Sequence, residues 1–139
     1  MIPSNAYRKQ QNTGWTRIDL VLALFDGAIE RLDRALEALK AGDSATAWPL
    51  QGRVQTIVMQ LMAGINLDVG DPNSINLMRL YEFCTHYLAQ QDIPKLESVR
   101  RVLDTLREGF RAIRDEAVNL ERTGAVPPAD STRLLETVG

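Results

Sequence analysis

The sequence predicts an all-α protein: an antiparallel up-down four-helix bundle with an extended N-terminal arm and a C-terminal tail. Apolar residues recur at alternating intervals of three and four in four separate stretches, which is the periodicity of amphipathic helices. Glycine, proline or aspartate marks each junction between these stretches. Because the links are only a few residues long, consecutive helices must run antiparallel.

The first helix is expected between Ile18 and Ala41, and the other helices have to cover it. Thr16 can cap its free backbone amides, and Asp19 completes a capping box. The pair Gly42-Asp43 supplies the stop. At about 1.5 Å per residue the helix is about 36 Å long, so only neighbouring helices of similar length can bury it. Its apolar stripe consists of Ile18, Val21, Phe25, Ile29, Leu32, Leu36 and Leu39.

The start of this helix carries more apolar residues than one partner helix can cover. They are Leu20, Val21, Leu22, Leu24 and Phe25. Two explanations are open at this point. Either the helix occupies a central position in the bundle, or part of the surplus contacts a separate protein, since a large exposed apolar patch usually marks a binding site.

The second helix is expected to start between residues 44 and 48, where Asp43 or Ser44 can cap it. Pro49 indicates an irregular first turn, because proline is comfortable only in the first turn of a helix. The main stripe consists of Ala47, Leu50, Val54, Ile57, Leu61 and Ile65. Beside it lie Val58, Met59 and Met62, for which both core filling and partner contact are open explanations.

The third helix is expected at about 74–90, after a turn at Gly70 and Asp71-Pro72. The fourth has Pro94 in its first turn and ends at Gly124. The third stripe consists of Leu77, Leu80, Tyr81, Cys84, Tyr87 and Leu88. The fourth consists of Leu96, Val99, Leu103, Leu106, Phe110, Ile113, Ala117 and Leu120.

The chain therefore divides into an arm (1–15), a four-helix bundle (16–122) and a tail (123–139), in which residues 131–137 allow a short helical turn. Tyr7 in the arm is either part of a frayed terminus or a residue that folds back to plug an apolar groove.

Composition excludes several classes of function. The net charge is −2 and the basic residues alternate with acidic ones, so no nucleic-acid partner is expected. The most apolar window, Leu20 to Ile29, is interrupted by Asp26 and is shorter than the roughly 20 residues that a membrane span requires, so no membrane insertion is expected. Cys84 is the only cysteine, which excludes an intramolecular disulfide and indicates a reducing, cytoplasmic location.

No combination of residues indicates catalysis. His86 is the only histidine and Phe83 stands three residues before it, so the Glu-x-x-His pairs of di-iron bundles are missing. Cys84 and His86 are two positions apart and lie on different faces of a helix, which separates them too far for nucleophilic catalysis. We therefore expect no enzymatic activity, no metal and no cofactor.

Several segments together resemble the FliS family of flagellar export chaperones. They are Asn5-Ala6-Tyr7, the leucine-rich run from Leu20 to Ala28, the run from Arg53 to Val58, Leu67-Asp68, and the block from Asn76 to Phe83. The resemblance covers about residues 5–115. The chain departs from the family pattern at Gly14-Trp15-Thr16, at Pro49 and Gly52, at Phe110 in place of a tryptophan, and in its longer tail.

The resemblance implies a cytoplasmic chaperone that binds the C-terminal segment of flagellin, prevents its premature polymerisation and presents it to the flagellar type III export gate. It implies that Tyr7 is a displaceable plug and that Asn76 hydrogen-bonds client backbone. The other residues expected to contact the client are Val54, Ile57, Val58, Leu61, Leu77, Leu80, Tyr81, Leu103 and Phe110. A monomer or weak dimer is expected, and the alternative is a helical bundle that self-associates and has no flagellin client.

Overall fold

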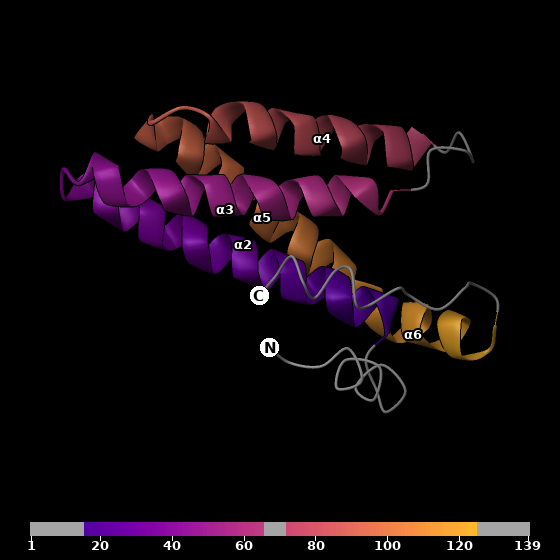
Figure 1. The fold of residues 1–139 in the computed structure, drawn as a ribbon. Helices are drawn as coiled ribbons and strands as arrows, with labels where there is room; N and C mark the ends of the chain where they lie inside the picture. The colour runs from indigo at the N-terminus through magenta and orange to yellow at the C-terminus, as the bar shows by residue number, and fades with distance from the viewer. Residues whose placement is uncertain (1–15, 66–71, 125–139) are drawn as a thin grey trace.

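The structure, a computed structural model, describes residues 16–65 and 72–124, and this part of the chain contains helices and no strand. This confirms the predicted all-α class. The five helices are α2 (Arg17–Lys40), α3 (Ser44–Ala63), α4 (Pro72–Leu88), α5 (Ile93–Ala112) and α6 (Arg114–Arg122) (Figure 1). The arm with Tyr7 and the tail from residue 125 lie outside the described residues.

The four long helices contact one another in a closed ring. Helix α2 packs against α3 and α5, and α4 packs against the same two helices. The diagonal pairs, α2 with α4 and α3 with α5, make no close backbone contact. In Figure 1, α3 lies alongside α2, and α6 lies at the end of the molecule where α2 begins.

Local hydrogen bonds fix the starts of α2, α3 and α5, and those at Thr16 and Asp43 are caps that the sequence predicts. The Thr16 N–H and hydroxyl both donate to the Asp19 carboxylate, at 3.3 and 2.9 Å. Asp43 accepts from the Thr46 N–H at 3.1 Å, and Asp92 accepts from the Lys95 N–H at 3.1 Å. These side chains satisfy backbone donors that have no partner inside the helix.

Helix α3 starts at Ser44, within the predicted range, and Pro49 lies inside it on the exposed side. The N–H that proline lacks would have bonded to the carbonyl of Ala45, which is itself an exposed residue. Water can therefore satisfy that carbonyl, and the helix continues through the proline.

The last predicted helix is divided in two at Ile113, which has φ −104° and ψ 7°. Neither glycine nor proline stands at the break, so nothing local signals it. The contacts beyond it supply the reason. Arg114 reaches Asp19 at 2.8 Å, and the Glu121 carboxylate accepts the backbone N–H of Arg17 at 3.1 Å. The turn thus brings α6 onto the N-terminus of α2, where negative charge is favourable.

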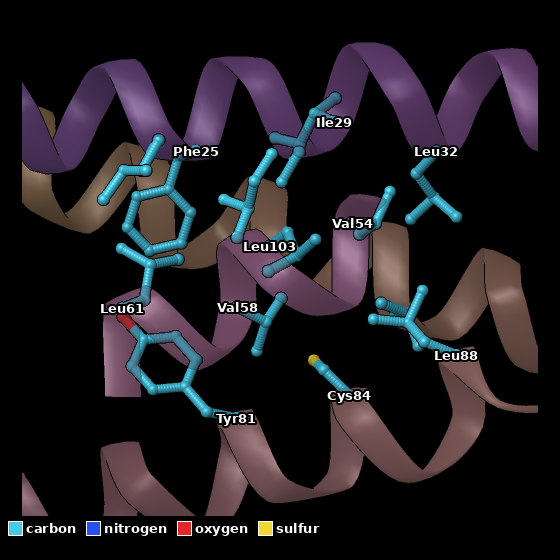
Figure 2. Close-up of a cluster of buried hydrophobic side chains, with 14 of the residues drawn as sticks. Phe25, Ile29, Leu32, Val54, Val58, Leu61, Tyr81, Cys84, Leu88 and Leu103 are labelled. Atoms are coloured by element: carbon cyan, nitrogen blue, oxygen red, sulfur yellow. The ribbon is translucent and has the colours of Figure 1, made fainter. Parts of the chain in front are cut away.

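The core lies between the four long helices (Figure 2). Phe25 is fully buried, and its ring centroid lies 6.4 Å from that of Tyr81 and 5.5 Å from that of Phe110. Leu20 and Leu24 are also buried, so a central position in the molecule explains much of the apolar surplus at the start of α2. The burial pattern follows the predicted stripes of α2, in which only Val21 and Leu39 are half-buried.

Candidate functional site

Six of the residues expected to contact a client are core residues. They are Val54, Ile57, Val58, Leu61, Tyr81 and Leu103, none with more than 5% of its surface exposed. In Figure 2 the labelled side chains of α3 and α4 point into the space between the helices. These six can reach a partner only if helices separate. In the closed bundle they pack against one another.

The other four described candidates reach the surface. Asn76 and Leu80 are exposed on α4, Leu77 is half-buried beside them, and Phe110 is half-buried on α5. Three of them lie close together in the sequence of α4, and Phe110 lies on α5, the helix that packs against it. The region formed by α4 and α5 therefore carries the accessible candidates.

Helical spacing extends this region along both helices. Asn76, Leu80, Phe83 and Tyr87 follow one another at intervals of four, three and four, which places them on one side of α4. The Lys95 ammonium lies 5.5 Å from the centre of the Tyr87 ring, so this side of α4 faces α5. On α5, Val102, Leu106 and Phe110 are spaced by four.

We call this surface the α4–α5 strip. Its members are the exposed Leu80 and six half-buried apolar residues that pack against the core: Leu77, Phe83, Tyr87, Val102, Leu106 and Phe110. Its aromatic rings are in contact, since the Phe83 and Tyr87 centroids are 4.4 Å apart and Phe110 packs on the buried Phe25. Sequence reasoning did not select Phe83, Tyr87, Val102 or Leu106, although their spacing from the selected residues could have identified them.

On the opposite side of α5, ion pairs join it to α2. Three aspartates of α2 pair with three arginines at 2.8, 3.0 and 2.8 Å: Asp33 with Arg100, Asp26 with Arg107, and Asp19 with Arg114. Members on each side are seven residues apart, so the pairs lie in one row, in which two pairs join α2 to α5 and the third joins α2 to Arg114, the first residue of α6. We call this row the α2–α5 ladder. The hydrogen bonds that Arg100 donates to Asp33 and Arg114 donates to Asp19 raise the pKa values of these two arginines.

Two glutamines attach α4 to α3. Gln51 is buried, and its amide donates to the carbonyls of Leu88 and Gln90 at 3.0 and 2.9 Å, at the C-terminal end of α4. Gln55 donates to the carbonyl of Thr85 at 3.0 Å. These bonds satisfy carbonyls that a helix end leaves free. They fix the C-terminal half of α4, whereas Leu77 and Leu80 of the strip lie in its other half.

Among the described residues there is no group of three or more His, Cys, Asp or Glu side chains that could hold a metal ion. Burial raises the pKa of the Cys84 thiol to about 12, which keeps it protonated and unreactive at neutral pH. A shallow cleft of about 410 Å³ between α2 and α5 has Leu36 among its lining residues and otherwise carries side chains of both charges. None of the helices in residues 16–65 and 72–124 is long and apolar enough to cross a membrane.

The sequence matches the family described as flagellar protein FliS over residues 2–117. The chain belongs to the FliS family. This confirms the resemblance found in the sequence, and the match includes α2 to α5 and the first residues of α6. FliS is a family of flagellar export chaperones. No curated protein matches the chain.

Proposed function

We propose that the chain is a cytoplasmic export chaperone that binds the C-terminal segment of flagellin, prevents its premature polymerisation and delivers it to the flagellar type III export apparatus. The observation that carries this proposal is the α4–α5 strip, a partly exposed apolar surface that is continuous with the core of a FliS family member. Contiguous apolar surface of this kind is typical of binding sites.

The strip has the form that receives an amphipathic helix. Its residues lie on two neighbouring antiparallel helices, so apolar side chains of a client at positions i, i+3, i+4 and i+7 can pack between them. A client segment that is disordered when free loses conformational entropy on binding, and the buried apolar area has to offset that loss. Apolar groups held in the strip are no longer available for contacts between flagellin subunits.

Individual residues have different roles in this proposal. Leu77, Leu80 and Phe110 supply apolar contacts, and Asn76 at the edge of the strip presents an amide that can pair with client backbone. The six buried candidates support the strip from beneath, as Phe25 does for Phe110. We also propose that Tyr7 plugs the strip when no client is bound. Thr16 stands nine positions further along the chain, a reach of up to about 30 Å for an extended chain.

We further infer that α2, α3, α4 and α5 are the up-down four-helix bundle that the sequence predicts, with α6 as an extension. The ring of contacts supports this, as do bonds that pair Gln51 with Leu88 and Gln55 with Thr85 in antiparallel order. One strip per chain leads us to expect one client segment per chain.

Two equally exposed leucines provide the test. Leu80 lies in the strip with 39% of its surface exposed, and Leu120 lies on α6 with 40% exposed. Calorimetric titration with a peptide of the flagellin C-terminal segment should show affinity reduced by roughly tenfold or more for Leu80→Glu, a cost of about 1.4 kcal/mol. Leu120→Glu should bind like the wild type, because its charge is added outside the strip.

Absence of binding heat with the unaltered chain would contradict the proposed client. Equal loss of affinity in both variants would contradict the proposed surface. Far-ultraviolet circular dichroism and urea unfolding of both variants would establish that each remains folded.

A further inference from the structure

The apolar stripe predicted for the last helix is covered along α5 and uncovered beyond it. Leu96, Val99 and Leu103 are buried on α5. At the other end of the stripe, Ile113 and Leu120 expose 48% and 40% of their surface. The break between the two helices causes this change, because α6 turns onto α2 and carries the end of the stripe with it. Apolar surface that continues a buried stripe is expected to have a cover of its own.

We call Ile113, Ala117 and Leu120 the α6 outer row. They are spaced by four and three, so they lie along one side of the helix. Val118, the buried residue of α6, stands two positions before Leu120 and therefore lies on the opposite side. Among residues 16–65 and 72–124, α6 makes close backbone contact with α2 and α5 alone, and these contacts leave both large members of the row accessible.

We propose that the segment after Gly124 folds back along α6 and covers the α6 outer row. The residues that make the contact are Leu134, Leu135 and Val138. They stand at positions i, i+1 and i+4, so they share one face of the short helical turn that the sequence allows in this segment.

The end of α6 leaves this segment within reach of the row. Gly124 has φ +80°, a left-handed conformation that ends a helix and turns the chain out of its axis. Its N–H donates to the carbonyl of Glu121 at 3.1 Å, so the turn begins directly at the helix end. Ten positions separate Gly124 from Leu134, a reach of up to about 33 Å for an extended chain. The row itself, from Ile113 to Leu120, is only about 11 Å long.

The size of the row favours a segment of the same chain over a separate protein. At nine residues α6 is about 14 Å long and about 10 Å wide, so one face offers about 140 Å². A specific interface between separate proteins buries roughly 1,200 Å² in total or more. A tethered segment needs much less, because a short linker holds it at an effective concentration in the millimolar range.

This inference goes beyond the proposed function and does not depend on it. The family match ends at residue 117, and both Leu120 and the segment after Gly124 lie beyond it. The contact is therefore argued from this chain alone. It is also separate from the α4–α5 strip, since Leu120→Glu is expected to leave peptide binding unchanged.

Hydrogen exchange followed by mass spectrometry tests the contact in the full chain. The backbone amides of residues 131–138 should exchange roughly tenfold more slowly in the unaltered chain than in Leu120→Glu, because a carboxylate in the row disfavours apolar cover. The matched control is Asn119→Glu, which adds the same charge at the neighbouring exposed residue, outside the row. In this control the amides of residues 131–138 should stay protected.

Disulfide formation locates the segment on α6. In a chain with Ala117→Cys and Leu135→Cys, one oxidised glutathione should convert the two thiols into an intramolecular disulfide and leave as two reduced glutathiones. The control pair, Asn119→Cys with Leu135→Cys, closes a loop of nearly the same length from the opposite side of α6. The first pair should close roughly tenfold faster, because the contact raises the local thiol concentration. Cys84 is buried and contributes no background.

Three results would overturn the proposal. The first is exchange of the amides of residues 131–138 at the rate of an unstructured peptide in the unaltered chain. The second is an equal effect of the two glutamate variants, or equal closure of the two cysteine pairs. The third is protection that depends on Leu120 but appears in residues before Thr16, which would make the N-terminal arm the cover of the row.

Discussion

The two sides of α5 are built on different physical principles. Towards α2, two aspartate–arginine pairs fix α5 against α2, and a third with the same spacing continues the row onto α6. Towards α4, apolar side chains predominate, the Lys95 ammonium lies over the Tyr87 ring, and no ion pair is found between the described residues of α4 and α5. Ion pairs with matched spacing accept one register and one partner, whereas apolar contact is non-directional and can accept another helix.

Under the proposed function, this difference would let the α2–α5 ladder hold α5 in place while a client replaced the proposed Tyr7 plug on the strip. Exposed ion pairs contribute little stability individually, so we assign the ladder a role in register more than in free energy. Substitutions can test this division, and the largest effect is expected at Phe25, whose ring lies near rings of both α4 and α5.

Phe25 should be the most sensitive position, because it is fully buried and touches the rings of both Tyr81 and Phe110. Phe25→Ala should lower the free energy of unfolding by about 3–5 kcal/mol, through lost burial and the cavity left behind. Phe110→Ala, at a half-buried position, should cost clearly less and should weaken binding of the flagellin peptide. Urea unfolding measures both changes, and equal destabilisation would refute the distinction between core and strip.

Among the arginines of the ladder, Arg107 should contribute most to the free energy of unfolding. It contacts Asp26 at 3.0 Å and Asp104 at 2.8 Å, and its side chain is only 18% exposed. Arg107→Met keeps the apolar stem and removes the charge, and it should cost about 1 kcal/mol of stability. Arg34→Met is the control, because its contact with Glu30 is long, at 3.9 Å, and largely exposed.

Salt should affect the ladder and the strip differently. Raising the salt concentration should reduce the loss of stability caused by Arg107→Met, since screening has already weakened the Arg107–Asp26 pair in the wild type. Peptide affinity at the strip should not fall in parallel, because apolar contact is not screened. A parallel decline of both quantities would mean that charge also governs the strip.

Asp19 should make stability depend on pH at the end of the ladder. Burial alone would raise its pKa, but hydrogen bonds from Arg114 and Thr16 outweigh burial and lower it. The folded state therefore binds this proton more weakly than the unfolded state, and the stabilisation is present above the unfolded pKa and lost as pH falls through the folded one. Asp19→Asn should cost about 0.5–1 kcal/mol at neutral pH, given its exposure. The difference from wild type should disappear in acid unfolding series.

The smallest effect is expected at Cys84, which should not react with a thiol reagent in the folded chain. Its side chain lies on α4 and is buried in the core, and its pKa of about 12 leaves it as a thiol at pH 8. A thiol reagent should label the chain at pH 8 only when urea unfolds it. Rapid labelling of the folded chain would show that α4 moves away from the core far more readily than the glutamine bonds to α3 indicate.

Features that depend on neighbouring residues in the chain could be predicted. The caps at Thr16, Asp43 and Asp92 are set within three residues, and the buried stripes follow helical spacing. The break at Ile113 could not be predicted, because its causes, Asp19 and Arg17, lie about 95 residues away in the sequence. The same limit applies to the site. Val54 and Leu80 are both apolar members of a stripe, and only the placement of the neighbouring helices decides that one is covered and the other exposed.

The contact of Glu121 with the first turn of α2 joins the beginning and the end of the described fold. Thr16 and Gly124 therefore lie at the same end of the molecule, next to the half of the strip that contains Phe110. The tight link at Gly42 lies at the opposite end of α2, and the link between α4 and α5 lies there too, because the Gln91 side chain donates to the Ser44 carbonyl at 3.0 Å. A label placed at Gly42 would therefore lie far from Phe110 and close to the part of the strip that contains Tyr87.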